Sequence, residues 1–125
     1  MAERLRFLPA GSDAFLVEVG DLETTLTLLD GLLAARPQGV TELVPAARTV
    51  MVRFDPLFTD RASLAAVISR IDLSARSDRQ GETIEVPVVY DGEDLGDVAE
   101  ILGWAVEDVV RRHAQATWTV AFTGF

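Results

Sequence analysis

The fold of this chain is encoded most clearly in Val40-Thr-Glu-Leu-Val-Pro-Ala-Ala-Arg-Thr-Val-Met-Val-Arg-Phe54. Alternate residues in its second half are apolar, which is the period of a strand that buries one face. These residues are Val50, Val52 and Phe54. The turn formers of Pro45–Arg48 separate this half from another apolar run, Val40–Val44. The sequence here therefore predicts two strands joined by a turn.

The same pattern opens the chain, and a helical period follows each pair of strands. Arg4–Leu8 and Ala14–Val19 flank the turn formers Pro9–Asp13, which predicts a β-hairpin. Asp21 and Asp60 are candidate N-caps, each followed by apolar residues at helical spacing. We expect both apolar stripes to lie in the core: Leu22, Leu26, Leu29 and Leu33 in the first, and Leu64, Val67, Ile68 and Ile71 in the second.

These elements predict an α+β fold in which residues 1–75 form a small two-layer α/β sandwich, with two strand-strand-helix units sharing one four-stranded sheet. The polar run Ser74–Gly81 then marks a boundary, so we place a linker over 76–82. Beyond the linker, residues 83–125 show a strand, an acidic loop, two short helices around Gly103 and a last strand. The apolar faces of these two strands carry Ile84, Val86 and Val88, and Trp118, Val120 and Phe122.

The second part is incomplete as a sheet, because one strand, two helices and another strand leave unpaired strand edges. Such edges predict self-association or partial disorder there. A size of 125 residues with 49% hydrophobic content still provides a real core for the chain.

The residue inventory excludes several kinds of chemistry. There is no cysteine and no lysine, and His113 is the single histidine. Thiolate sites, Schiff-base chemistry and two-histidine metal sites are therefore excluded, and we expect no metal. Gly92, Gly96 and Gly103 fit neither common phosphate-binding glycine spacing. Because no stretch approaches about 20 apolar residues, we expect a cytoplasmic protein that does not bind membranes.

Residues Asp97–His113 have the cadence of a DNA-binding helix-turn-helix. However, six acidic residues oppose two arginines from Glu93 to His113, and the chain has a formal net charge of −9. Acidic side chains repel phosphates, so we expect no nucleic-acid partner. The structural alternative is a helical pair that packs its apolar residues inward: Val98, Ile101, Val106, Val109 and Val110.

Two polar features have both structural and functional interpretations. The carboxylates of Asp91–Asp94 lack the ligand spacing of a calcium loop, which favours a solvated turn. His113 lies near the predicted end of the second helix, where a partly protonated imidazole complements the helix dipole. An acid or base role for His113 would require a partner group from elsewhere.

Four runs of sequence together resemble the family that includes allophanate hydrolase subunit 1, the B subunit of 5-oxoprolinase and the inhibitor of the sporulation histidine kinase. They are Gly11–Gly20, Glu42–Pro56, Val86–Leu95 and His113–Phe125. The resemblance implies a two-layer α/β domain followed by a cyclophilin-like β-barrel. Residues 83–125 would then be the start of that barrel with its helical insertion, and the chain the N-terminal part of a subunit.

The resemblance also implies what the protein does. Enzymes of this family act with a larger homologous second subunit, and in the 5-oxoprolinase case also with a third. They hydrolyse 5-oxoproline at the expense of ATP or cleave allophanate. We therefore expect a hydrolase subunit that is inactive alone and has no cofactor in this chain, ATP serving the whole complex. His113 is the candidate catalytic residue, and four others are candidates for lying near substrate or partner: Tyr90, Asp91, Gly124 and Phe125.

Two alternatives stay open at this point. A regulatory protein resembling the histidine-kinase inhibitor would share the same fold and bind a kinase helical bundle. A DNA-binding module built on residues 97–113 would require salt-sensitive DNA binding despite the acidic charge.

Overall fold

The computed structural model describes residues 4–75 and 81–123, which fall into two compact units. Unit 1 comprises Met1–Arg79 with Ala121–Phe125, and unit 2 comprises Gln80–Val120. Most of the linker predicted over 76–82 lies outside the described residues, so each unit is considered by itself.

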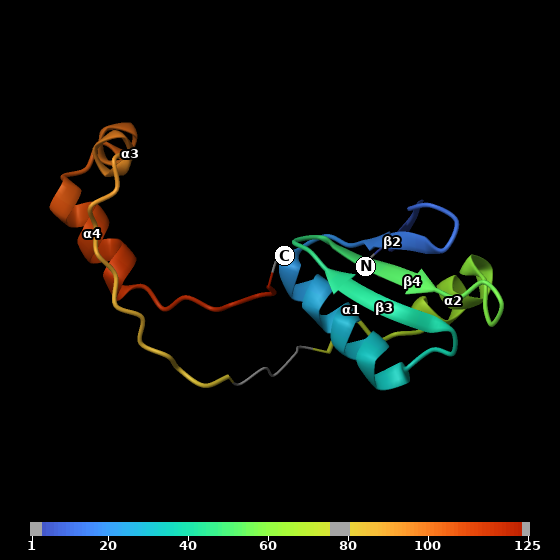
Figure 1. The fold of residues 1–125 in the computed structure, drawn as a ribbon. Coiled ribbons are helices and arrows are strands. Elements are labelled where there is room, and N and C mark those ends of the chain that lie inside the picture. Colours follow the sequence, from blue (N-terminus) through green and yellow to red (C-terminus); the bar gives the residue numbers. More distant parts are fainter. Residues whose placement is uncertain (1–3, 76–80, 124–125) are drawn as a thin grey trace. The chain divides into compact units, whose positions relative to one another are not determined.

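Unit 1 contains the predicted four-stranded antiparallel sheet (Figure 1). Its strands are β1 (Arg6–Pro9), β2 (Ala14–Glu18), β3 (Val40–Pro45) and β4 (Thr49–Phe54). Their spatial order is β1-β2-β4-β3, so β2 and β4 are central and each hairpin contributes one edge strand. The sequence from Val40 to Phe54 therefore forms one half of the sheet.

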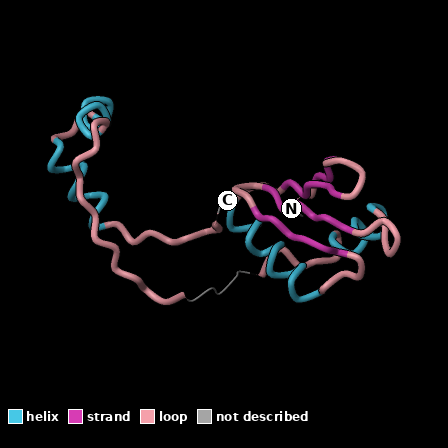
Figure 2. Tube along the Cα trace, viewed as in Figure 1, coloured by secondary structure: helices cyan, strands magenta, loops and turns pink. Residues whose placement is uncertain are grey.

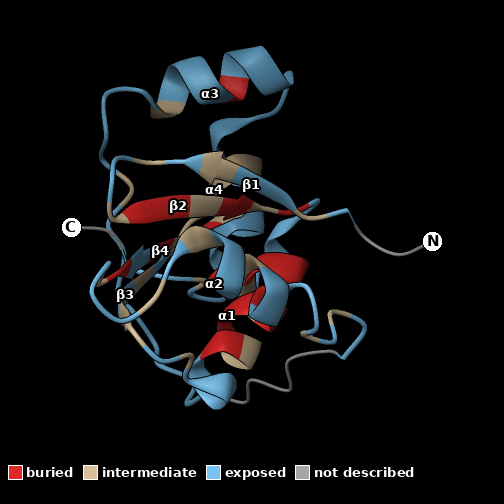
Figure 3. Ribbon diagram, turned by 90° about the vertical axis from the view of Figure 1, so that its right-hand side faces the viewer, coloured by how far each residue is buried: buried red, intermediate tan, exposed pale blue. Residues whose placement is uncertain are grey.

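Helices α1 (Leu22–Ala35) and α2 (Arg61–Ile68) pack on one face of this sheet. A single apolar cluster joins the sheet and both helices, and Figure 3 marks its buried segments in red. The strand residues predicted to be buried are 0–4% exposed, which confirms that prediction: Val50, Val52 and Phe54. Each fully buried aliphatic side chain contributes about 1.5–3 kcal/mol relative to an exposed one, so this cluster is the main source of stability.

Both predicted N-caps are confirmed. A side-chain oxygen of Asp21 accepts a hydrogen bond from the backbone N–H of Thr24 at 2.8 Å, and Asp60 accepts one from Ser63 at 2.9 Å. Each bond satisfies a donor that the first helical turn leaves unpaired. Because these bonds stabilise the ionised carboxylates, they hold the pKa of Asp21 and of Asp60 below the ordinary value.

The leucine stripe predicted for α1 is wrong at its ends, since Leu22 is 38% and Leu33 is 53% exposed. The buried face is instead formed by Thr25, Leu28, Leu29 and Leu32, with Thr24 and Thr27 beside them. The hydroxyls of Thr25 and Thr27 donate to backbone carbonyls one turn earlier, at 2.8 and 3.0 Å. These local bonds satisfy the threonine hydroxyls, so the core accepts polar residues that hydrophobicity alone assigns to the surface.

The stripe predicted for α2 is confirmed at Leu64 and Ile68, which are buried, whereas Val67 is 38% exposed. Ile71 lies just beyond the end of α2 and packs against the core. It also lies against Gly31 of α1, where an added Cβ would come within 2.4 Å of the Ile71 side chain. Gly31 therefore permits a close approach between α1 and the segment that follows α2.

Unit 2 contains helices α3 (Leu95–Leu102) and α4 (Val106–Gln115), flanked by extended segments (Figure 2). The strands predicted around Ile84–Val88 and Trp118–Phe122 are wrong, since the described residues of both runs carry no strand assignment. The physical reason is that neither run has a hydrogen-bonded ladder partner among the described strands, and a strand is defined by its ladder.

The helical pair is confirmed, but its predicted inward packing is not. Val98, Ile101 and Val106 are 41%, 84% and 39% exposed, and Val109 and Val110 are half-buried. Only Ala99 is buried among the described residues of unit 2. Two helices of 8 and 10 residues lack the third layer that would enclose a core. Across the described residues, no helix combines the length and apolarity that crossing a membrane requires.

Candidate functional site

Three aromatic side chains of unit 2 meet at the last turn of α4, and two of them are predicted site residues. The Tyr90 hydroxyl lies 2.8 Å from Nδ1 of His113, and the two rings meet edge to face with centroids 5.7 Å apart. Trp118 also contacts the imidazole, its ring centroid 5.0 Å from that of His113. The imidazole is thus held by two aromatic rings.

A backbone bond fixes Trp118 in this cluster as well. The indole N–H of Trp118 donates to the backbone carbonyl of His113 at 3.0 Å. That carbonyl belongs to the last turn of α4, where carbonyls lack helical partners, so the indole caps the helix. The cluster therefore ties the extended segment before α3 and the one after α4 to the same helix end.

The helix pair places His113 through a glycine turn. Gly103 ends α3 with a left-handed backbone, φ 65°, and its N–H bonds back to the carbonyls of Ala99 and Glu100. Helix α4 then carries acidic residues in its first turn and Arg112 and His113 in its last, which complements the helix dipole. Arg112 lies over the ring of Trp104, with its guanidinium carbon 4.3 Å from the ring centroid.

Hydrogen bonding to Tyr90 engages only one nitrogen of His113. When the Tyr90 hydroxyl donates to Nδ1, the proton of a neutral imidazole sits on Nε2, which can then donate to another group. His113 is exposed and Tyr90 is half-buried, so the cluster is open to a ligand or a partner chain. An acid or base role still requires a second group, because neither Tyr90 nor Trp118 is an ordinary proton acceptor at neutral pH.

The other predicted site residues do not join this cluster. Asp91 follows Tyr90 in an exposed loop and is not part of the bonded group among the described residues. Gly124 and Phe125 lie outside the described residues. In the described part of the chain, no group of three His, Asp or Glu side chains is arranged to hold a metal ion.

The sequence indicated Tyr90 and His113 separately, and their contact was missed because 23 residues separate them. The role of Trp118 as a helix cap was also missed, since its alternation with Val120 indicated a strand. The one available signal was the clustering of the chain's single tyrosine and single histidine with a tryptophan in unit 2.

Comparisons with known proteins agree with one family. The family model described as carboxyltransferase domain, subdomain C and D, matches residues 5–125. The B subunit of 5-oxoprolinase from Haemophilus influenzae is 33% identical over 92 residues, which cover 70% of this chain and 43% of that protein. The chain thus spans less than half the length of this curated relative.

Solved structures share the fold of the chain. The crystal structure of TTHA0988 is 28% identical with a TM-score of 0.62, covering 90% of this chain and 22% of that chain. K. lactis urea amidolyase shares the fold, with 16% identity and a TM-score of 0.59 over 88% of this chain and 9% of that chain. The α+β class and the family predicted from the sequence are confirmed, and the chain belongs to the carboxyltransferase subdomain C and D family that includes the B subunit of 5-oxoprolinase.

Proposed function

We propose that this chain is the N-terminal part of a 5-oxoprolinase subunit, which works in an ATP-dependent complex and is inactive without a larger homologous subunit. The observation that carries the proposal is the family match over residues 5–125 together with the 33% identity to a relative named as the B subunit of that enzyme. The reaction adds water across the lactam C–N bond of 5-oxoproline to give glutamate, while ATP is cleaved to ADP and phosphate.

The residue inventory supports inactivity of the isolated chain. Lactam hydrolysis needs a group that activates water and another that stabilises the developing oxyanion. His113 is the single histidine, and the groups bonded to it are a phenol and an indole. The glycines offer no common phosphate-binding spacing. We therefore expect ATP binding and at least one catalytic group to come from the rest of the subunit or from the partner subunit.

The cluster at the end of α4 has a defined place in this proposal. Tyr90, His113 and Trp118 fix the two extended segments that flank the helices, and these segments carry many of the exposed apolar side chains of unit 2. We assign His113 a site-proximal role in which its Nε2 contacts substrate or the partner subunit. Asp91, Gly124 and Phe125 stay predictions as residues near substrate or partner.

The test is reconstitution with the larger homologous subunit from the native source. The chain alone is expected to release no glutamate from 5-oxoproline and ATP, whereas the complete subunit mixed with the larger subunit is expected to release it. His113→Gln keeps a hydrogen-bonding side chain of similar size, and we expect it to lower kcat while the two subunits still co-purify. Arg70→Gln, an exposed change in unit 1, is the matched control and should leave turnover unchanged.

Three results would contradict the proposal. ATP-dependent turnover by the isolated chain would refute its inactivity alone. Turnover of allophanate but not of 5-oxoproline would move the assignment to the other hydrolase of the family. Recovery of a histidine kinase without any larger homologous subunit, and no turnover, would favour the kinase inhibitor.

A further inference from the structure

The sheet face opposite the helices carries a continuous row of four aliphatic side chains. The strand register pairs Leu8 with Leu16, Leu16 with Met51, and Met51 with Val44, so the row crosses all four strands. Val44 is 40% exposed and the other three are half-buried. The open face of a two-layer antiparallel sheet is ordinarily polar. A full aliphatic row there indicates a surface that is covered in the working protein.

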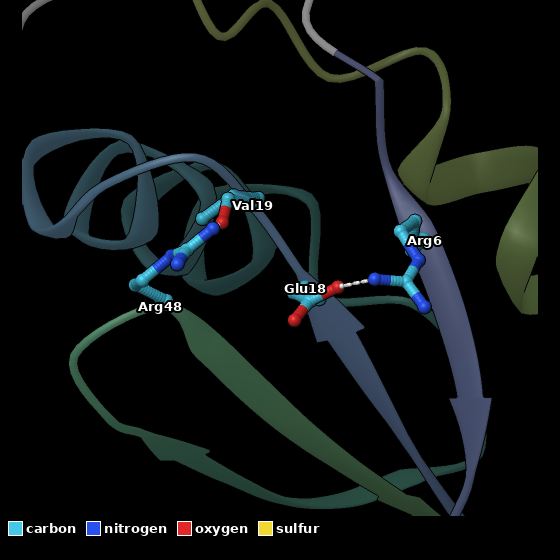
Figure 4. A network of polar contacts seen from close by, with 4 residues as sticks. All are labelled: Arg6, Glu18, Val19 and Arg48. Carbon is cyan, nitrogen blue, oxygen red and sulfur yellow. Dashed lines mark hydrogen bonds and ion pairs between the residues drawn. The ribbon is translucent and has the colours of Figure 1, made fainter.

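Two ion pairs flank this row on opposite sides. Arg6 and Glu18 lie 2.6 Å apart on one side (Figure 4), and Arg53 and Glu42 lie 3.4 Å apart on the other. Two arginines and two glutamates cancel, so the charges of these two pairs sum to zero in a chain with a formal net charge of −9. A second copy can approach this neutral surface without the repulsion that the net charge imposes elsewhere.

The flanking charges are also self-complementary. Arg6 lies on edge strand β1 on one side of the row, and Glu42 lies on edge strand β3 on the other side. The two residues thus mark opposite ends of one diagonal of the face. A two-fold axis in the plane of contact and perpendicular to this diagonal places Arg6 of each copy over Glu42 of the other. Contacts of this reciprocal kind define an isologous interface.

The same rotation satisfies the packing rule for two sheets. Across the strands, the face is three strand spacings of about 4.8 Å wide. Along the strands, it is four residues of about 3.4 Å long, so its two sides are nearly equal. A two-fold axis perpendicular to the diagonal of a square face crosses the strands of the two copies at nearly a right angle. Orthogonal packing is one of the two preferred arrangements of stacked sheets, and it brings Leu16 and Met51 of both copies to the centre.

We propose that this face is the interface of a symmetric homodimer of the chain, with the aliphatic rows crossing at its centre and Arg6 of each copy paired with Glu42 of the other. The inference is independent of the enzymatic assignment, because it rests on unit 1 alone. The intramolecular pairs at Arg6 and Glu42 remain in place, and each becomes part of a larger charge network across the interface.

The test is a set of charge reversals read by sedimentation equilibrium of the whole chain. Arg6→Glu and Glu42→Arg each place like charges together twice in the dimer, and each is expected to weaken dimerisation about tenfold or more. The double variant, Arg6→Glu with Glu42→Arg, restores opposite charges across the interface and is expected to restore the dimer. Both reversals leave like charges inside each copy, beside Glu18 and Arg53, so rescue cannot come from the intramolecular pairs.

Arg70→Glu, which makes the same charge change on an exposed residue after α2, is the control and should not alter the association. A wild-type chain that stays monomeric up to millimolar concentration overturns the proposal and leaves the row for a different protein. A dimer that persists unchanged in both single reversals also overturns it, because the interface then lies elsewhere. Failure of the double variant to associate better than the single variants would exclude the proposed pairing.

Discussion

The two units differ in how far their apolar side chains are enclosed. In unit 1, strands and helices from distant parts of the sequence share one cluster of 11 buried residues. In unit 2, side chains of the same types are exposed, including Ile84 at 74%, Ile101 at 84% and Val120 at 80%. Both units have apolar residues at regular spacing, but among the described residues only unit 1 has a sheet against which its helices can pack.

Hydrophobic pattern and enclosure are therefore separate properties of a sequence. Unit 1 has both and should be stable by itself, whereas unit 2 is held locally by helix-end bonds and by the cluster around His113. Exposed apolar surface of this kind is typical of regions that contact another chain or another part of the same protein. Matched substitutions in the two units can break or sharpen this contrast.

The largest contrast is expected from one substitution made in both units. Ile68→Ala removes a fully buried side chain of α2 and should lower the free energy of unfolding by about 2–5 kcal/mol, because it leaves a cavity. Ile101→Ala on α3 removes a side chain that is 84% exposed. It should change the free energy of unfolding by less than about 0.5 kcal/mol. Urea unfolding followed by far-UV circular dichroism measures both. Equal changes in the free energy of unfolding would show that the two side chains are buried to the same extent, which would contradict the contrast between the units.

A second matched pair uses the helical glycines. Gly31→Ala should destabilise unit 1 by about 1–3 kcal/mol, since the new Cβ would meet Ile71 at 2.4 Å. Gly96→Ala on α3 meets no atom within 4 Å, and it should stabilise that helix by about 0.5–1 kcal/mol through its higher helix propensity. Thermal unfolding provides the comparison. Stabilisation by Gly31→Ala would contradict the close approach of α1 to Ile71.

The pH dependence should also separate the units. Asp21 and Asp60 accept hydrogen bonds from backbone N–H groups, which holds the pKa of each below its ordinary value. A carboxyl group with a lowered folded pKa stabilises the protein above its unfolded pKa, and this stabilisation is lost as the pH falls through the folded pKa. The N-cap residues of α3 and α4 make no side-chain cap bond, so these helices lack this contribution.

We therefore expect the Tm of unit 1 to fall below about pH 4. Asp21→Ala with Asp60→Ala should reduce that acid sensitivity and lower the Tm at neutral pH by several degrees, because each substitution removes a helix N-cap. Calorimetry across the acid range and up to neutral pH tests this. An unchanged Tm at neutral pH would refute the capping role of both aspartates.

The smallest effect is expected at the candidate site. Tyr90→Phe removes the hydroxyl that contacts His113 but keeps the aromatic ring, so it should cost about 0.5–1.5 kcal/mol locally. Both tryptophans and the single tyrosine lie in unit 2, so intrinsic fluorescence reports this unit specifically. We expect a changed Trp118 emission with unit 1 unfolding at the same urea concentration. A shift of the unit 1 transition would contradict the separate stability of the units.

Much of unit 1 could be predicted from the sequence, because its signals are local. The strand period depends only on a few neighbouring residues, Val50, Val52 and Phe54. The same holds for the helix caps Asp21 and Asp60. The buried face of α1 could not be predicted from leucines alone, since five of its residues from Leu26 to Leu33 are leucine. Its buried threonines are satisfied by bonds to backbone carbonyls, which hydropathy does not register.

The candidate site was predictable only as separate residues. His113 was placed correctly near the end of a helix, but its contact with Tyr90 depends on how the segment before α3 returns to α4. The runs Ile84–Val88 and Trp118–Phe122 have a genuine strand period, yet a strand also requires a neighbour, and a neighbour is not encoded within the run itself.

Hydrogen exchange would show whether unit 1 folds by itself while a partner subunit orders the apolar segments of unit 2. Exchange would be followed by mass spectrometry in the chain alone and with the larger homologous subunit. We predict slow exchange for β2, β4 and α1 in both samples, with residues 84–90 and 116–120 exchanging fast alone and slowly in the complex. Slow exchange of these two segments in the isolated chain, or no added protection on mixing, would contradict this account of the two units.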